Sequence, residues 1–200
     1  MPKFKPKQQN GLSATAGASV FRWLPTGAEA LGAMLSAIGG AQRSICLEMY
    51  IFTPGGLGNR FRQALVEARR RGVRVRVLID AFGSFGLPTA YWAPLTEIGG
   101  EFRWFNAFHS VARYGRRNHR KLVVADGERA IIGGMNVSEE YDGDGVSHGW
   151  RDLGLEIRGP LAAALETSFE QIYEPAPSPS LAGPFHPFAL TPDTAVRGSN

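Results

Sequence analysis

Apolar residues recur along the chain at two different spacings, and these spacings predict a succession of helices and strands. From residue 27 to 40 they stand three and four positions apart, which indicates a helix, and Thr26 occupies the position expected of its N-cap. Residues 44–52 (SICLEMYIF) are apolar on both alternating faces, which is typical of a strand covered by helices on both sides. An amphipathic helix that ends at Gly72 and the strand VRVRVLID (73–80) follow. This order predicts a parallel β-α-β unit with a right-handed crossover.

Strand patterns dominate the rest of the chain. A short helix is expected around residues 91–98, and a strand at EFRWF (101–105). The segments HRKLVVAD and RAIIGG predict a hairpin, because the Asp-Gly pair at 126–127 between them is a strong turn signal. A further strand, WRDLGLEIRG, precedes a last helix. The inward stripe of that helix is expected to consist of Leu161, Leu165, Phe169 and Ile172.

Composition divides the chain into three parts. Residues 1–20 begin with alternating lysines and continue with small and polar residues, which predicts a basic, flexible leader. Residues 175–200 hold six prolines and no regular apolar period, which predicts a linker or tail. The patterned region between them, residues 21–174, is expected to form one α/β domain.

Charge and composition narrow the functional classes only a little. Of the 200 residues, 44% are hydrophobic and 20% are charged, as in an ordinary globular chain. The net charge of +4 favours anionic partners, which include nucleic acid, anionic lipid and phosphorylated small molecules. The single cysteine, Cys46, lies in an apolar run and is assigned no role. Neither a signal peptide nor a membrane-spanning stretch is recognisable, so we expect a cytoplasmic chain that can touch a membrane surface.

The segment NHRKLVVADGERAIIGGMN (118–136) carries the candidate chemistry. It places His119, Lys121 and Asp126 in an H-x-K-x4-D pattern. A Gly-Gly-x-Asn sequence that ends at Asn136 comes after this pattern. Residues two apart in a strand share a face, so His119 and Lys121 are expected to point the same way. The hairpin returns Gly133, Gly134 and Asn136 beside them. An imidazole, an ammonium and an amide are therefore predicted to converge on one spot.

That combination of groups suits a phosphodiester. A neutral imidazole can attack phosphorus, and a protonated one can release an alkoxide. The ammonium and the amide can stabilise charge on the nonbridging oxygens. These parts require no metal, and no other cofactor is expected. The alternative interpretation is an ordinary polar edge strand, in which the two glycines mark a turn or a bulge.

These residues resemble the signature of the phospholipase D superfamily. The fuller pattern N-H-R-K-x4-D-G-x5-G-G-x-N-x3-E-Y, which runs from Asn118 to Tyr141, is similar to the first half of bacterial cardiolipin synthases. The resemblance covers about residues 20–174. It implies a phospholipase D-like α-β-α sandwich, in which helices flank a mixed sheet, and it implies that residues 21–174 form one motif-bearing half.

The resemblance also implies roles for individual residues. His119 matches the nucleophile or its acid partner, and Lys121 and Asn136 match the groups that bind phosphoryl oxygens. Asp126 belongs to the same catalytic motif, usually as a structural member. Asp152 matches the acidic residue that orients a catalytic histidine, whereas from the sequence alone a surface salt bridge with Arg151 is the default.

One departure from the family pattern is large. Members build the site from two such motifs, and this chain has one. The remaining histidines, His109, His148 and His186, are not followed by lysine two positions later. The chain is therefore half of a longer protein, or a homodimer that brings two His119 side chains together, or an inactive remnant.

The resemblance favours one function over several others. It implies a phosphatidyltransferase of the cardiolipin synthase type that acts on a phosphatidylglycerol-like phospholipid through a phosphohistidine, at the inner face of the cell membrane. A basic loop can meet anionic headgroups or a nucleic-acid backbone, and its arginines are Arg113, Arg116, Arg117 and Arg120. The alternatives are a metal-independent phosphodiesterase or nuclease and a noncatalytic phosphate-binding or membrane-binding module.

Overall fold

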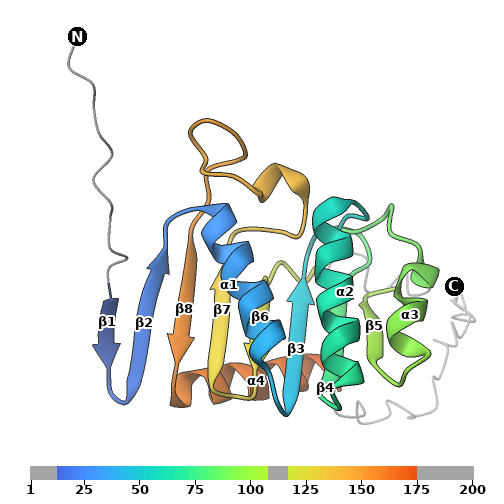
Figure 1. Ribbon diagram of the computed structural model, residues 1–200, viewed down its shortest axis with the longest axis horizontal. Helices are drawn as coiled ribbons and strands as arrows, with labels where there is room; N and C mark the ends of the chain where they lie inside the picture. Colours follow the sequence, from blue (N-terminus) through green and yellow to red (C-terminus); the bar gives the residue numbers. More distant parts are fainter. Residues whose placement is uncertain (1–12, 108–116, 175–200) are drawn as a thin grey trace, which may run out of the picture.

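The computed structural model describes residues 13–107 and 117–174, and its framework is one mixed sheet of eight strands in the order β1-β2-β8-β7-β6-β3-β4-β5 (Figure 1). The strands are β1 (Ser13–Ala16), β2 (Ser19–Leu24), β3 (Ser44–Met49), β4 (Arg74–Asp80), β5 (Glu101–Phe105), β6 (Leu122–Ala125), β7 (Arg129–Gly133) and β8 (Gly154–Arg158). The helices are α1 (Gly27–Gly40), α2 (Gly56–Arg70), α3 (Ala93–Thr96) and α4 (Pro160–Tyr173). Two 3-10 turns, η1 (Thr89–Trp92) and η3 (Glu139–Tyr141), lie in the connections.

Helices cover the sheet on both faces. Figure 1 shows α1, α2 and α3 on one face and α4 on the other. The strand β3 supplies Ile45, Leu47 and Met49 to the core under α1 and α2, and Cys46 to the core under α4. The expected α-β-α sandwich is therefore confirmed, and the strand with two apolar faces lies at its centre.

Local signals in the first half of the domain produce the elements that they predict. The Thr26 hydroxyl accepts a hydrogen bond from the Glu29 backbone N–H at 3.1 Å, which caps α1. The strands β3 and β4 are parallel, as the β-α-β order predicts, and β5 is parallel to β4. Within the described ranges, no helix is long and apolar enough to cross a bilayer.

The expected leader is too long at its C-terminal end. The strand β1 begins at Ser13 and pairs with β2, which in turn pairs with β8, so the sheet extends into residues 13–20. The turn of this hairpin contains Gly17 at φ 60°, a left-handed conformation that glycine adopts easily. The strand β2 escaped prediction because it lacks a clean alternation, with Val20 and Trp23 46% and 41% exposed. Residues 1–12 and the predicted tail at 175–200 lie outside the described residues.

The apolar stripe of α4 differs by one position from the expected one. Leu161, predicted to point inward, is 41% exposed, and the neighbouring Ala162 is fully buried. Phe169 and Tyr173 are buried on the same face, while Leu165 and Ile172 pack partly against it. Leu161 directly follows the first helical residue, Pro160, and the sheet-facing positions begin one residue later.

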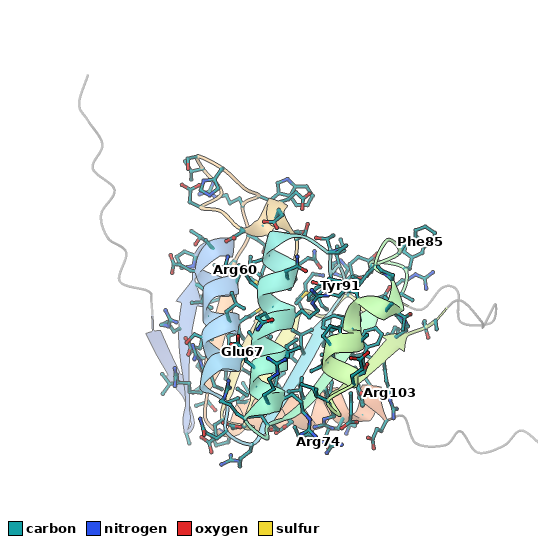
Figure 2. The ribbon with its side chains drawn as sticks, turned by 45° about the vertical axis from the view of Figure 1, so that its right-hand side comes forward. Arg60, Glu67, Arg74, Phe85, Tyr91 and Arg103 are labelled. Carbon is teal, nitrogen blue, oxygen red and sulfur yellow. The ribbon has the colours of Figure 1, made fainter. Side chains whose placement is uncertain are left out.

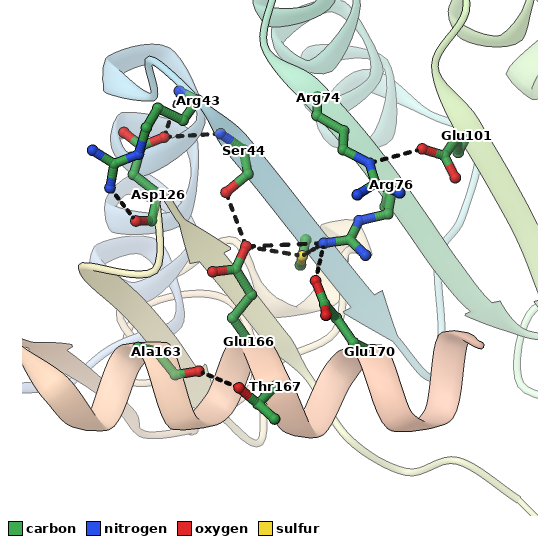
Figure 3. Close-up of polar contacts among 11 residues, drawn as sticks. Arg43, Ser44, Arg74, Arg76, Glu101, Asp126, Ala163, Glu166, Thr167 and Glu170 are labelled. Atoms are coloured by element: carbon green, nitrogen blue, oxygen red, sulfur yellow. Dashed lines mark hydrogen bonds and ion pairs between the residues drawn. The ribbon is translucent and has the colours of Figure 1, made fainter. Parts of the chain in front are cut away.

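A polar cluster on β3 and β4 fastens α4 to the sheet (Figure 3). Arg76 is 3% exposed, and its guanidinium donates to the Glu170 carboxylate at 2.7 Å. The Ser44 hydroxyl donates to the Glu166 carboxylate at 2.9 Å. Cys46 lies in the same cluster, where burial, opposed by the Arg76 charge, raises the pKa of its thiol to about 12. Such a thiol stays protonated at neutral pH.

Replacing Arg76 with Ala should lower the free energy of unfolding by about 2 kcal/mol, because it leaves the α4 carboxylates that face the sheet without their cation. Arg74→Ala is the matched control, since the ion pair of Arg74 with Glu101 is exposed and its loss should cost less than about 1 kcal/mol. Urea unfolding followed by circular dichroism measures both. Equal losses in the two variants would mean that the buried cluster contributes nothing particular to holding α4.

Candidate active site

The predicted motif lies at one edge of the sheet, where β6 begins and β7 ends. The turn between these strands contains Asp126 and Gly127 at φ 58° and 65°, so the Asp-Gly hairpin is confirmed. The strand β6 starts at Leu122, one residue later than Lys121, so the histidine and the lysine stand just outside the paired strand. Asn136 follows β7 and Asp152 precedes β8 at the same edge, because neighbouring strands here run antiparallel.

His119 and Lys121 are in direct contact. The Lys121 Nζ lies 3.2 Å from His119 Nδ1 and donates to the His119 carbonyl oxygen at 2.8 Å. The Tyr50 ring packs 4.5 Å from the imidazole, centroid to centroid, and 5.1 Å from the ammonium. His119 is exposed, whereas Lys121 is buried. Burial lowers the pKa of Lys121, and the negative charge of Asp152 partly opposes this shift.

Asn136 is fixed by two hydrogen bonds at the end of β7. Its Oδ1 accepts from the Ile51 backbone N–H at 3.0 Å, and its Nδ2 donates to the Tyr141 hydroxyl at 2.9 Å. A primary amide has two N–H donors, so one of them remains beyond the Tyr141 bond. Through Ile51, the residue after Tyr50, Asn136 is bonded to the segment that packs on His119.

The two glycines of the motif make room for protein groups. A Cβ on Gly134 would lie 2.3 Å from an Asp152 carboxylate oxygen, and a Cβ on Gly133 would lie 2.5 Å from the Leu153 carbonyl oxygen. The space over Gly134 therefore belongs to Asp152, the carboxylate whose negative charge acts on Lys121. Asp152 accepts a hydrogen bond from the Leu153 N–H at 2.6 Å, and its contacts do not include the His119 ring.

Asp126 lies at the opposite edge of the sheet from the other motif residues. Five strand positions separate it from Lys121, which is about 16 Å at the usual rise per residue. Its carboxylate accepts hydrogen bonds from the backbone N–H groups of Gln42, Arg43 and Ser44. Asp126 therefore lies apart from His119 and Lys121, and it ties the hairpin turn to the start of β3.

A buried polar cluster lies beneath His119, and it was not predicted from the sequence. Glu48 is fully buried, and its carboxylate accepts a hydrogen bond from Asn118 Nδ2 and pairs with the Arg120 guanidinium at 3.2 Å. The Asn118 backbone N–H donates to the Asp80 carboxylate at 2.9 Å. Burial raises the pKa of Glu48, and Asn118 and Arg120 oppose that shift. The available signal was Glu48 itself, the only charged residue in SICLEMYIF.

A pocket of about 490 Å³ opens beside the motif on the α4 face of the sheet. Its polar lining consists of His119, Arg120 and Lys121. Its apolar lining comes from Trp23, Leu122, Ile132, Leu153, Leu155 and Leu165. The histidine and the lysine thus stand at the border between an apolar hollow and solvent.

The other candidate groups are not brought to His119. The His148 Nδ1 contacts the Ser147 hydroxyl and lies 4.0 Å from the Asp144 carboxylate. Arg120 points inward to Glu48 and Ser168 instead of outward to a ligand. His109, Arg113, Arg116 and His186 lie outside the described residues. In residues 13–107 and 117–174, no group of three His, Cys, Asp or Glu side chains is placed to hold a metal ion.

Replacing Asp126 with Ala should destabilise the domain by about 2 kcal/mol at pH 7, because three backbone donors lose a charged acceptor. Burial raises the pKa of Asp126, but the bonds from Ser44, Gln42 and Arg43 outweigh it, so the pKa lies below its ordinary value of 3.8. The advantage of wild type should therefore be complete above that value and disappear as the pH falls through the lower, folded pKa. Urea unfolding at pH 7 and pH 3 measures it, with the exposed Glu128→Ala as control.

Replacing Asn118 with Ala should lower the free energy of unfolding by about 2 kcal/mol, because Glu48 keeps a buried oxygen without its donor. The ring resonances of His119 in a ¹H–¹³C correlation spectrum should shift as well, since residue 118 holds the backbone next to the imidazole. Gln63→Ala is the control, because Gln63 is exposed on α2. Unchanged His119 resonances in Asn118→Ala would show that this cluster does not position the histidine.

Solved structures share this architecture. NucT from Helicobacter pylori superimposes with a TM-score of 0.61 at 13% identity, over 78% of this chain and 96% of that one. The phospholipase D family member Nuc from Salmonella typhimurium gives a TM-score of 0.56 at 22% identity, over 78% of this chain and 93% of that one. At these identities the similarity establishes the fold, and the fold is that of phospholipase D proteins.

The sequence itself places the chain more narrowly. The family described as cardiolipin synthase, PLD-like domain, matches residues 34–173. Cardiolipin synthase A from Pseudomonas aeruginosa (strain LESB58) is 38% identical over 154 residues, which cover 75% of this chain and 31% of that protein. The chain therefore corresponds to about a third of the length of such relatives. Its motif, its sheet and this match agree, and the chain belongs to the cardiolipin synthase family of phospholipase D-like domains.

Proposed function

We propose that this chain supplies one motif-bearing half of a phosphatidyltransferase of the cardiolipin synthase type. The observation that carries the proposal is the exposed His119 ring in contact with the buried Lys121 cation, in a chain that matches this family. The substrate class is a phospholipid with a phosphodiester, such as phosphatidylglycerol. The reaction exchanges one alcohol on phosphorus for another.

The first step forms a bond between a His119 ring nitrogen and phosphorus and breaks the bond from phosphorus to the headgroup oxygen. The departing alkoxide takes a proton from a second acid and leaves as the free alcohol. In the second step an acceptor hydroxyl gives its proton to that same group and attacks phosphorus. The P–N bond breaks, and His119 returns to its neutral state.

The placement of Lys121 defines the tautomer of the neutral His119 ring. A charged ammonium can only donate, so at 3.2 Å it makes Nδ1 the acceptor and leaves the neutral ring protonated at Nε2. Attack by Nε2 requires that proton to move to Nδ1, and attack by Nδ1 requires Lys121 to turn toward the phosphoryl oxygens. In either case Lys121 lies where it can stabilise charge on phosphorus.

Asn136 and Asp152 complete the proposed half-site. The second N–H of the Asn136 amide is proposed to bind a phosphoryl oxygen at the same sheet edge, as the family resemblance implies. The negative charge of Asp152 opposes the lowering of the Lys121 pKa by burial and so helps to keep that amine cationic. Orientation of the imidazole by Asp152, which the family resemblance implies, requires that its carboxylate turn from the Leu153 N–H to the His119 ring.

The second acid is proposed to come from outside the described residues. The chain matches 31% of a relative, which supports a second motif on a further segment of the same protein. A homodimer that pairs two His119 side chains is the alternative source. We place the enzyme at the inner face of the cell membrane as a peripheral protein, because its proposed substrate is a bilayer lipid.

The proposal predicts that His119→Ala abolishes covalent labelling. Incubation with ³²P-phosphatidylglycerol and a metal chelator should label the wild-type chain when it is mixed with the second motif-bearing half of a relative, and rapid denaturation at high pH preserves a phosphohistidine for mass analysis. Labelling should fall by at least about 10³-fold in His119→Ala and stay unchanged in the control His148→Ala. Label retained in His119→Ala removes that residue from the reaction.

The same preparation separates the other functions. Cleavage of plasmid DNA in the presence of chelator, without labelling by lipid, would replace the transferase by a metal-independent nuclease. If the chain, mixed with the second motif-bearing half of a relative, catalyses neither reaction, it is assigned to a noncatalytic binding module.

A further inference from the structure

The helix α4 leaves part of its side of the sheet uncovered. Figure 1 shows α4 crossing the lower ends of the strands, whereas α1 and α2 on the other face run along the strands. Figure 2 shows that other face, where the exposed side chains of Arg60 and Glu67 lie on the outer side of α2. The α4 face therefore has a covered lower part and an open part near the edge that carries His119.

One row of apolar side chains lies in the open part. Neighbouring strands pair its members in the order Trp23, Leu155, Ile132 and Leu122. Directly paired residues point to the same face of a sheet, so the four side chains lie side by side. All of them line the pocket of about 490 Å³ that opens beside the motif. Four strands at a spacing of about 4.8 Å make this row about 14 Å long.

The next row down shows where α4 ends its cover. Its members, which pack with α4 in one apolar core, are Phe21, Ile157, Ala130 and Val124. In the upper row, by contrast, Trp23 is 41% exposed, and Leu155 and Ile132 are half-buried. Leu165 of α4 lines the pocket from below. The upper row is therefore an apolar wall with open space in front of it.

This wall begins at the candidate catalytic groups and leads away from them. Leu122, its first member, directly follows Lys121, and both residues line the pocket. Beyond Leu122 the same row continues to Glu48 on β3, whose carboxylate pairs with Arg120 at 3.2 Å. The apolar row thus ends at the motif on one side and reaches the exposed Trp23 on the other.

The polar groups of the pocket suit a single anionic group. Its polar lining consists of His119, Arg120 and Lys121, and the described residues that line it include no carboxylate. The charge of Arg120 is already paired with Glu48, and Asp152 acts on Lys121 from outside the lining. One cation beside one imidazole, at the end of an apolar hollow, fits an amphiphile that carries one negative charge.

We infer that this pocket is a subsite for an acyl chain of the phosphatidyl ligand, which lies along the row from Leu122 to Trp23. The inference rests on the proposed function and names the part of the substrate that the site recognises. A phosphate bound at His119 carries its acyl chains through covalent bonds, so a chain has to lie within reach of that phosphate.

The shape of the hollow supports a small ligand as its occupant. Its volume lies in the range of about 300–1,000 Å³ that is usual for ligand pockets, which are concave and mostly apolar with a few placed polar groups. The polar groups stand at one end, where a headgroup phosphate is proposed to bind, and the apolar row supplies the rest. This division matches a lipid and selects it over a protein surface.

Binding of soluble monoacyl lipids tests the subsite without requiring turnover. The probes are lysophosphatidylglycerol with a hexanoyl or an octanoyl chain, and glycerophosphoglycerol, which has the same phosphodiester and no acyl chain. Isothermal titration of the chain measures each Kd. The octanoyl probe should bind at least about fivefold more tightly than the hexanoyl probe, because two more CH₂ groups are buried. Glycerophosphoglycerol should bind most weakly.

The variant Trp23→Ser should lose this dependence on chain length, because the end of the longer chain no longer meets an apolar wall. Its two lipid Kd values should differ by less than about twofold, and Trp23→Phe should restore the wild-type difference. Leu161→Ser is the matched control, since Leu161 is also 41% exposed but lies outside the pocket. It should keep the wild-type difference. Thermal unfolding checks that each variant is folded.

A second measurement locates the chain without depending on Trp23→Ser. An octanoyl probe with bromine at the end of its chain should quench tryptophan fluorescence in the wild type, because bromine quenches a ring that it contacts. Most of that quenching should disappear in Trp23→Phe, which keeps the apolar wall and removes the fluorophore.

Three results would overturn the inference. They are equal or absent binding of the three probes by wild type, quenching that persists in Trp23→Phe, and loss of octanoyl binding when the second motif-bearing half of a relative covers Trp23. The last result would assign the row to a protein interface. Binding that depends on chain length without ³²P labelling would contradict only the proposed function, and labelling without such binding would contradict only the subsite.

Discussion

Glu48 is completely buried at the end of the central strand, and a carboxylate in that position has to find its partners inside the protein. It finds them in Asn118 and Arg120, the two residues that flank His119. Because leaving Glu48 unpaired would cost free energy, its two partners hold the backbone on both sides of the imidazole in place. The exposed His119 therefore has a defined position, because both of its chain neighbours are bonded to the buried Glu48.

The remaining site follows from the meeting of strand ends at one edge. The antiparallel order of β6, β7 and β8 returns Asn136 and Asp152 to the edge where Lys121 enters the sheet. Asp152 occupies the space that a side chain at Gly134 would need, so the glycine and the carboxylate depend on each other. Lys121 is then buried opposite one negative charge, which offsets part of the cost of burial.

The residues of the motif lie at the two ends of a single strand, β6. His119 and Lys121 stand at one end of β6, and Asp126 holds the other end to the chain entering β3. One short sequence signature thus contributes to the candidate site at one end of the strand and to anchoring at the other. Sheet geometry explains the division, because about 3.3 Å per residue carries the last member of the pattern far from the first.

The sequence by itself determined the elements whose signals are local. The Thr26 cap, the doubly apolar strand β3, the β-α-β crossover and the Asp126-Gly127 turn depend on neighbouring residues only, and all of them form as predicted. The family resemblance added the residues of the proposed half-site. The tertiary structure alone decided the features that join distant segments: the edge hairpin from Ser13, the inward face of α4, the partners of Glu48, and the separation of Asp126 from His119. Those features depend on which side chains meet across the sheet, and spacing along one strand carries no information about its neighbours.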